Sequence, residues 1–526
     1  MSIRQFESNQ VKAPFLGKPH YPISGLDQLG LNLTSERIFD LLLPGLNNVT
    51  QRVRYYSFYC WFFDWYAKTI RNTSRSKQNN YLRRAEFLLA LIAAYKNLGG
   101  VPGITKAQAI FESIDETINL KLGTQEDANS EGSYWKNPRG VLGQYYISSI
   151  KQMGILGDQG DKEGLYIRTD FEHQTKVSGK QLADAFSQNT SSNIQIFTDA
   201  IENNYITKKE LELLSIDYNM LDIPDKSKEQ KLLWKLFSGV DRPKETQETY
   251  FRKETIKLIL SNITQNEEEE EKYNQLNVPF SIYGNGWQTD YSTTEKLWYF
   301  FILEQFWSVS CTGCLDAFLK ILDEKSSNNW IDEIELIDHI VSKVSTLFDS
   351  KGASKKEHLF FGKPFKKDSV EELVNLSKKE NDPYIKIFLT LCAIQKLFIE
   401  NKTSVSELIT ISNNFKIHTP SSFLNAYNDF DLKNDFTITQ FVEFFIISYV
   451  VNRHHFVALR KLNATQNSAK FYRDDGMIRF VDDFHYDYSS PRIHTLFDFM
   501  RDLNIIDSKT TTLTSKGLEH LKNLEQ

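Results

Sequence analysis

The sequence predicts a mainly α-helical protein of several subdomains that also carries two small α+β modules. Apolar residues recur at three- and four-residue spacing through most of the 526 residues, which indicates amphipathic helices. Strand signals are few and short. The chain is also longer than a single hydrophobic core usually organises, so about three or four domains are expected.

The N-terminal half is predicted to be helical for most of its length. A short helix over 35–43 ends where Pro44 and the glycine after it break the chain. A long helix begins near Thr50 and is apolar on most of its faces, which is typical of a central helix. A second helix is expected over 81–98, and residues 193–265 read as helical hairpins.

The C-terminal half follows the same pattern. A run of five acids, Glu267 to Glu271, is interpreted as a solvated linker, and a long helix is expected over 293–322. Further helices are predicted over 330–349, 369–379, 383–399, 404–414 and 437–462. A β-hairpin is predicted to join 470–473 to 477–481, because an Asp-Gly pair between two short apolar runs is a hairpin signal.

Two distant stretches of the chain resemble each other: residues 137–182, the first repeat, and residues 490–518, the second repeat. Each reads as a helix, a tight turn, a short apolar strand, a wing, a second strand and a closing helix. Gly154 and Asn504 stand just past the first helix, where a left-handed residue often ends it. The first wing is longer and contains a predicted strand at 165–167.

The closing helix of each repeat begins at a hydroxyl residue, Ser178 or Thr514, which suits an N-cap. The arrangement resembles the winged-helix modules of bacterial transcription regulators. In that family a recognition helix ends in Leu-Gly-Ile/Leu-Ile, and Leu-Thr-x-x-Gly opens the last helix. Residues 503–506 and 513–517 match this pattern with Asn in place of the first Gly. The first repeat matches less well, because Gln181 stands where the pattern has Gly.

This resemblance implies two winged-helix modules in a chain that is otherwise helical, and a fold alone does not assign a function. The predicted organisation has five parts. They are an N-terminal helical domain (1–125) with a basic loop (71–84), a winged-helix-like module (126–192), a helical region with the acidic linker (193–275), a helical domain (276–465), and a C-terminal hairpin with the second winged-helix-like module (466–526).

Composition excludes several classes of protein. The net charge of -6 gives no general attraction to nucleic acid, so any such contact must be local. Four scattered cysteines do not suit a disulfide scaffold, and the pair Cys311 and Cys314 lies in an apolar helical run, so buried thiols are expected. The polar start shows no signal peptide and the longest apolar runs are too short to span a bilayer, so a cytoplasmic location is expected. Nucleotide-binding and hydrolase motifs are absent, and no cofactor is expected.

One segment is strongly basic. Between Gln51 and Arg84 the sequence has eight cations and a single acid, Asp64. Five of the cations cluster around the polar stretch 71–80, namely Arg71, Arg75, Lys77, Arg83 and Arg84. Such a loop suits contact with nucleic-acid phosphates. The alternative is a solvated loop without a ligand.

The segments that contain the two repeats, residues 139–186 and 491–526, are neutral, because the acids in each equal the cations in number. A DNA reader normally presents a basic face, and Asp498 and Asp502 on the second recognition-like helix would repel phosphate. Docking of a partner protein is therefore favoured over direct DNA reading. If the repeats do bind DNA, the candidate residues are Arg139, Lys151, Arg492, His494, Arg501 and Lys509.

A metal site is a weaker hypothesis. Asp483, His485 and Asp487 alternate, so in an extended strand they share one face. Carboxylates and imidazole hold divalent metals that hydrolyse phosphodiesters. The favoured alternative is that Phe484, Tyr486 and the tyrosine at 488 face the core while the polar residues face water.

Three hypotheses about function follow. The first is a non-enzymatic adaptor or scaffold of a prokaryotic multi-protein system, with antiviral defence as one setting, that docks partner proteins through the repeats and touches DNA or RNA through the basic loop. The second is a metal-dependent nuclease that uses Asp483, His485 and Asp487. The third is a sequence-specific DNA-binding regulator. A membrane partner is not expected.

Overall fold

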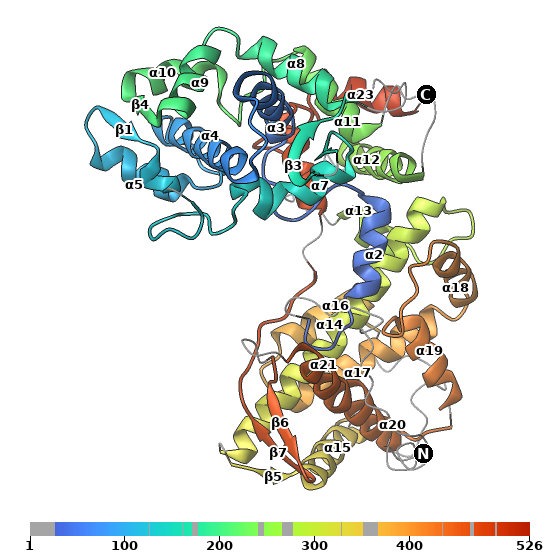
Figure 1. Ribbon diagram of the computed structural model, residues 1–526. Helices are drawn as coiled ribbons and strands as arrows, with labels where there is room; N and C mark the ends of the chain where they lie inside the picture. The colour runs from blue at the N-terminus through green and yellow to red at the C-terminus, as the bar shows by residue number, and fades with distance from the viewer. Residues whose placement is uncertain are drawn as a thin grey trace. The chain divides into compact units, whose positions relative to one another are not determined.

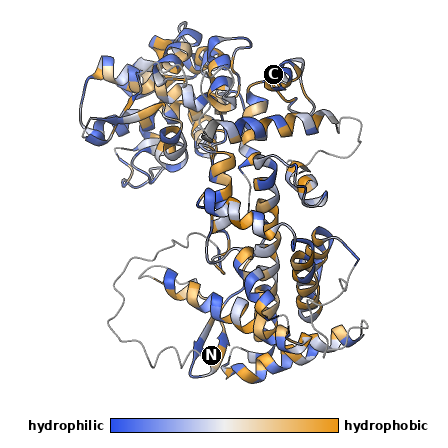
Figure 2. Ribbon diagram, turned by 90° about the vertical axis from the view of Figure 1, so that its right-hand side faces the viewer, coloured by the Kyte–Doolittle hydropathy of each residue, from blue (hydrophilic) through white to orange (hydrophobic). Residues whose placement is uncertain are grey.

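The computed structural model describes residues 27–125, 127–160, 162–170, 177–239, 247–265, 277–327, 329–350, 367–433, 435–462, 468–489 and 492–525. The protein is mainly α-helical with small antiparallel sheets, which confirms the predicted class (Figure 1). Most helices carry both hydrophobic and hydrophilic residues along their length (Figure 2), the pattern that lets one face pack inward. The predicted acidic linker at 267–271 lies outside the described residues.

The chain forms two compact units whose boundaries differ from the predicted domains. Unit 1 comprises residues 1–34, 304–409 and 418–488, and unit 2 comprises residues 35–303, 410–417 and 489–526. The segment 466–526, predicted as one domain, is divided after Tyr488. The module predicted at 126–192 belongs to the same unit as the N-terminal helices.

Unit 2 is built around α3 (Arg54–Trp65), which continues as the π-helix η1 (Tyr66–Ile70). Every residue of α3 from Arg54 to Phe63 is buried, which confirms the predicted central helix. The next helix, α4 (Arg75–Tyr95), begins earlier than predicted, because the Ser74 hydroxyl accepts a hydrogen bond from the Lys77 N–H and caps it. The polar stretch 71–80 is therefore mostly helix and not loop.

The remaining elements of unit 2 follow in chain order. They are α2 (Leu33–Leu42), α5 (Ile104–Ser113), β1 (Thr117–Asn119), α6 (Lys121–Thr124), η2 (Leu142–Tyr146), α7 (Ile147–Gln152), β2 (Leu156–Gln159), β3 (Lys162–Arg168), α8 (Gly179–Asn189), α9 (Ile194–Asn203), β4 (Tyr205–Thr207), α10 (Lys208–Asp217), α11 (Lys228–Ser238), α12 (Gln247–Gln265), α13 (Asn277–Gly284), the first part of α14 (Thr293–Ser326), α22 (Ile493–Asp502) and α23 (Ser515–Glu525). β1 pairs with β4 and β2 pairs with β3, both antiparallel. The helices α8 and α11 and the strand β3 pack on α3 (Figure 1).

Unit 1 contains the second part of α14 and one three-stranded sheet. Its other elements are β5 (Ile331–Asp332), α15 (Glu333–Ser350), α16 (Val370–Lys379), α17 (Pro383–Glu400), α18 (Val405–Asn414, which crosses a unit boundary along the chain), α19 (Phe423–Leu432), α20 (Ile438–Phe445), the π-helix η3 (Ile446–Val451), α21 (Asn452–Lys461), β6 (Phe471–Asp474) and β7 (Met477–Phe480). The predicted hairpin is confirmed, with positive φ at Asp475 (42°) and Gly476 (79°) as a primed turn requires. The strand β5, which pairs with β7, and the helix α19 were not predicted. All four cysteines are buried free thiols, as expected.

Three buried carboxylates cap helix N-termini from distant parts of the chain. Glu86 accepts hydrogen bonds from the backbone N–H groups that begin η2 and from a tyrosine hydroxyl, and Glu304 accepts from the Phe423 N–H at the start of α19 (3.0 Å). Asp502 accepts from the Val53 N–H ahead of α3 (3.2 Å). Free N–H groups at a helix N-terminus attract negative charge. Burial nevertheless raises the pKa of Glu86 and Glu304 to about 8 and that of Asp502 to about 7.

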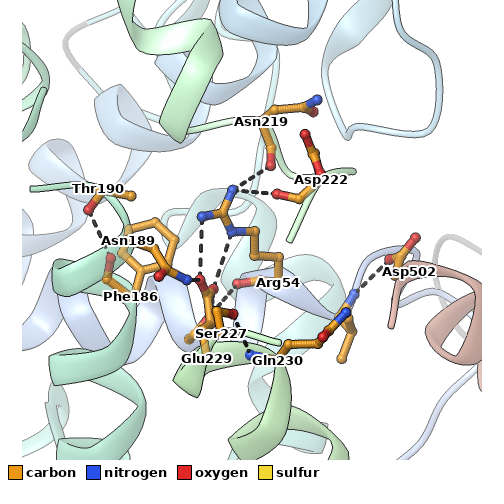
Figure 3. A network of polar contacts seen from close by, with 12 residues as sticks. Arg54, Phe186, Asn189, Thr190, Asn219, Asp222, Ser227, Glu229, Gln230 and Asp502 are labelled. Carbon is orange, nitrogen blue, oxygen red and sulfur yellow. Dashed lines mark hydrogen bonds and ion pairs between the residues drawn. The ribbon is translucent and has the colours of Figure 1, made fainter. Parts of the chain in front are cut away.

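A buried ion pair fixes α11 on α3 (Figure 3). Arg54 donates to both carboxylate oxygens of Glu229, at 3.2 and 3.3 Å, and to the backbone carbonyls of Asn219 and Asp222, at 2.7 and 2.8 Å. Glu229 also accepts from the Asn189 amide at 2.7 Å and from a serine hydroxyl on α3. Every charge in the network therefore has partners, which is what a buried ion pair needs in order to be tolerated.

The first prediction concerns pH. The ordinary pKa is 4.5 for Glu86 and Glu304 and 3.8 for Asp502, so unfolded chains release these protons well below neutral pH. Between those values and pH 7 to 8 the folded state binds more protons than the unfolded state. The three groups therefore make the free energy of unfolding fall as the pH rises through this window. Burial lowers the pKa of His454 to about 4, which makes stability rise with pH up to about 6.5 and opposes the three carboxylates, so the test is a comparison of variants. We expect the stability to urea of Glu86→Gln at about pH 8, relative to that at about pH 5, to be higher than the same ratio for the wild type.

The control for this measurement is Glu131→Gln, which changes an exposed carboxylate and should retain the wild-type pH dependence. The exposed acids whose pKa values are lowered, such as Asp127 and Asp507, titrate below this window and do not mask the effect. Equal pH dependence in wild type and Glu86→Gln contradicts the prediction.

The second prediction concerns the buried pair. Glu229→Gln leaves Arg54 charged and without its counter-charge, so we expect the free energy of unfolding to fall by about 3 kcal/mol or more. A double variant with methionine at both positions should recover much of that loss, because both charges are gone. Urea unfolding measures both variants, with the exposed Glu212→Gln as control. Wild-type stability in Glu229→Gln contradicts the prediction.

Candidate nucleic-acid interface

Both repeats end their first helix in the same way. Gly154 (φ 73°) and Asn504 (φ 58°) adopt the left-handed conformation that the sequence predicted. The Gly154 N–H donates to the Lys151 carbonyl at 3.0 Å, and the Asn504 N–H donates to the Arg501 carbonyl at 2.9 Å. In each case the isoleucine that follows turns back into the core and is fully buried.

The second strand of each repeat is anchored by a threonine. The Thr169 N–H donates to the Ile155 carbonyl at 3.0 Å, and the Thr514 N–H donates to the Ile505 carbonyl at 3.0 Å. Each threonine hydroxyl also donates to the carbonyls at the preceding turn. Thr169 is thus the equivalent of Thr514, although the sequence pattern aligned Ser178 with it.

A glycine packs under the strand in both repeats. The N–H of Gly179 donates to the Thr169 hydroxyl at 3.0 Å, and the N–H of Gly517 donates to the Thr514 hydroxyl at 3.0 Å. A Cβ at Gly179 would lie 2.1 Å from the Ile155 carbonyl oxygen, and one at Gly517 would lie 2.3 Å from that of the isoleucine at 505. The glycine that the pattern appeared to lack at Gln181 is therefore present two positions earlier.

The predicted N-caps of the closing helices are confirmed. The Ser178 hydroxyl accepts from the Gln181 N–H, and the Gln181 side chain accepts from the Ser178 N–H, which completes a capping box on α8. Thr514 accepts from the N–H three residues later. The predicted strand at 165–167 is part of β3, and in the second repeat the wing is reduced to a bridge between Ile506 and Leu513.

The first helix of each repeat contacts α3, and α22 is buried over most of its length, whereas only Ser149 and Ile150 of α7 are buried. Tyr56 of α3 shares a hydrogen bond with Ser149 of α7, and its ring meets Phe499 of α22 edge-on at 5.7 Å. The buried residues of α22 are Ile493, Thr495, Leu496, Phe497, Phe499 and Met500. Asp502, expected to repel phosphate, is instead paired with Arg52 at 2.9 Å with its side chain 4% exposed.

The structure divides the five clustered cations into two groups. Arg71, Arg75 and Lys77 are exposed. Arg83 is 1% exposed and donates to the Thr124 carbonyl at 2.5 Å. Its guanidinium is therefore bound inside unit 2 and does not face a ligand at the surface. Arg84 is half-buried, donates to a backbone carbonyl of α9 at 3.1 Å and lies over a tyrosine ring. Phosphate contact by this cluster stays a prediction for the first three residues only.

The start of α4 is fastened to the wing of the first repeat. The Gln78 amide donates to the Tyr166 carbonyl at 3.0 Å and accepts from the Tyr166 N–H at 2.9 Å, as a neighbouring strand would. Arg75 lies beside Gly164 of β3. A Cβ built on Gly164 would be 3.8 Å from the Arg75 Cδ. This contact was not predicted, because a single buried glutamine joins segments that are 88 residues apart.

The two cations predicted in the first repeat meet the same strand. Arg139 donates to the Tyr166 hydroxyl, and the Lys151 Nζ lies 5.1 Å from the centre of the Tyr166 ring. Lys151 is also paired with Asp158 at 2.7 Å. The structure therefore gathers predicted cations from two segments around β3. We call the wing surface the set of Arg71, Arg75, Lys77, Arg139, Lys151 and the exposed Lys162 of β3.

Two of the cations predicted in the second repeat, Arg492 and Arg501, have partners within unit 2, and Lys509 is exposed. Arg492 forms an ion pair with Asp40, and Arg501 forms one with Asp498 at 3.1 Å. The His494 side chain is exposed to solvent. The part of it that is buried lowers its pKa below the ordinary value. The first two residues of this repeat lie outside the described residues.

The predicted metal site is not formed. Asp483, His485 and Asp487 are exposed, while Phe484 and its aromatic neighbours are turned inward, as the favoured alternative proposed. Asp487 forms an ion pair with Lys378. Over the described residues no three His, Cys, Asp or Glu side chains are grouped so that they could hold a metal ion.

Among the helices of the described segments, none combines the length and the apolar composition that crossing a bilayer requires. Comparison with known proteins assigns no family: no family model matches the chain, and neither a curated protein nor a solved structure matches it significantly.

The third prediction tests the equivalence of the two repeats. Gly179→Ala and Gly517→Ala each push a methyl group against a backbone carbonyl, so we expect each to lower the free energy of unfolding by about 1–3 kcal/mol. Gly157→Ala is the control, because an added Cβ there has no atom within 4 Å. Urea unfolding compares the three variants. A neutral effect at either Gly179 or Gly517, with the control also neutral, contradicts the shared geometry.

Proposed function

We propose that the protein is a non-enzymatic binding protein that contacts nucleic-acid phosphates through the wing surface and serves as an adaptor in a larger assembly. The observation that carries the proposal is the reciprocal hydrogen bonding of Gln78 and Tyr166. It joins the basic start of α4 to the wing strand β3, so that cations from separate segments act as one surface.

The character of these cations favours an extended polyanion without sequence reading. Arg71, Arg75, Lys77 and Lys162 are exposed and sit on the turn before α4, on its first turn and on a wing strand. Such charges reach phosphate oxygens, and phosphate contacts position a protein without reading bases. The net charge of -6 means that binding depends on this local surface and is weakened by salt.

The winged-helix resemblance contributes to the adaptor part of the proposal. In the second repeat the recognition-like helix α22 packs into unit 2 and keeps only His494, Asp498 and Arg501 toward its outer side, with the latter two paired. A neutral face of this kind suits a protein partner better than a DNA groove. A sequence-specific regulator is accordingly the less favoured proposal.

The fourth prediction reverses the charge of the surface. The variant Arg71→Glu/Arg75→Glu/Lys77→Glu should lose most affinity for random-sequence DNA or RNA, and the salt dependence of what remains should weaken by about one unit of log–log slope for each lost contact. Fluorescence anisotropy with labelled single and double strands over a salt series measures both quantities.

The matched control is Lys96→Glu/Lys209→Glu/Lys522→Glu, which makes the same change of charge at exposed lysines elsewhere in unit 2. It should keep most of the wild-type affinity. Equal losses in the two triple variants would show that only total charge matters. Wild-type affinity in the first variant removes the wing surface from consideration.

A further inference from the structure

Unit 2 contains a lysine-lined pocket that is separate from the wing surface. It has a volume of about 770 Å³ and lies between α11 with its preceding loop and the turn and closing helix α23 of the second repeat. Five lysines line it, Lys226, Lys228, Lys231, Lys235 and Lys516. The acids of the lining are Asp225 and Glu519. The pocket is thus a positive site in a chain of net negative charge.

The lysines are held in place by the packing of α11. Lys228, Lys231 and Lys235 recur at three- and four-residue spacing, so they share one face of the helix. The opposite face is fixed by the buried pair of Glu229 and Arg54 (Figure 3). Gln230 donates to the Leu503 carbonyl at 3.1 Å, which ties α11 to the turn of the second repeat. The lysine spacing was visible in the sequence, but the opposing wall was not.

The opposing wall comes from α23. His520 packs on Trp234 with ring centres 4.5 Å apart, and both line the pocket. Trp234 is 6% exposed, and its indole N–H has no hydrogen-bond partner among the described residues. Lys516 contacts the Gln230 side chain and is 3.5 Å from Asp225. Burial lowers the pKa of Lys516 from its ordinary value, so an anion at this wall would stabilise its charge.

We propose that this pocket binds a small ligand that carries several linked phosphates, such as a nucleoside triphosphate. The volume falls within the range of small-molecule sites, which is about 300–1,000 Å³. Several ammonium groups around one concavity suit a compact polyanion, because lysine binds phosphate as a point charge. Without a ligand, Asp225 is the ion-pair partner of Lys516. When the ligand binds, one of its phosphate groups replaces Asp225 as that partner.

The experiment is isothermal titration calorimetry on the full-length protein at low salt without divalent metal. The probes are ATP, inorganic tripolyphosphate and AMP. We expect ATP and tripolyphosphate to bind and AMP to bind at least about tenfold more weakly, because AMP offers a single phosphate to the same lysines. Lack of binding by both ATP and tripolyphosphate overturns the proposal, and so does AMP binding as tight as that of ATP.

Variants locate the binding. Lys228→Glu/Lys231→Glu changes exposed side chains and should abolish the heat of binding, whereas Asp225→Asn should tighten it several-fold by removing the competing carboxylate. Lys96→Glu/Lys209→Glu, which makes the same change of charge at exposed lysines outside the pocket, is the matched control and should bind as wild type does. Undiminished ATP binding in Lys228→Glu/Lys231→Glu places the site elsewhere and overturns the proposal. The wing-surface variant should still bind ATP, so the two sites are tested independently.

Discussion

The N-terminal end of α3 is the junction on which unit 2 depends. Arg52 and the backbone N–H of Val53 both bind Asp502, and Arg54 binds Glu229, so three consecutive residues hold two distant segments. The partners lie 450 and 175 residues away from Arg52 and Arg54. A buried charge is costly unless it is paired, so the carboxylates of Asp502 and Glu229 tie the second repeat and α11 to this end of α3. The Asp502 carboxylate also places negative charge at the N-terminal end of α3, where backbone N–H groups lack partners within the helix.

This junction explains why the repeats serve the core as much as the surface. Turning Asp502 inward commits one side of α22 to unit 2, and the hydrogen bond between Tyr56 and Ser149 does the same for α7. A recognition helix packed in this way has little surface left for a DNA groove. In the first repeat the wing is accessible together with Ser148, Lys151 and Gln152 of α7, and Gln78 holds the start of α4 beside that wing. In the proposed function the phosphate contacts therefore involve the wing strand β3 and the start of α4, and not the helix α22.

Local signals in the sequence predicted local structure well. The burial of α3, the caps at Ser178 and Thr514, the left-handed residues after each first helix and the hairpin at 470–481 all depend on neighbouring residues, and all are confirmed. The errors have long-range causes. Arg83 looked like a surface cation because its carbonyl acceptor, Thr124, is 41 residues away. Thr169 was missed because the inserted wing shifts the register of the repeat. The lysine pocket needs α23 as its second wall, which no spacing along α11 reveals.

The two basic sites differ in how their cations are arranged. On the wing surface the side chains are exposed, and salt near 0.1 M screens charges over about 10 Å, so each contact is weak and many are needed. An extended nucleic-acid backbone supplies many. In the pocket Lys228 and Lys231 are exposed as well, but five lysines line one concavity with Trp234 and His520, so their fields add at one place. A compact polyanion gains most there, because its linked charges meet several ammonium groups at the entropic cost of ordering one molecule.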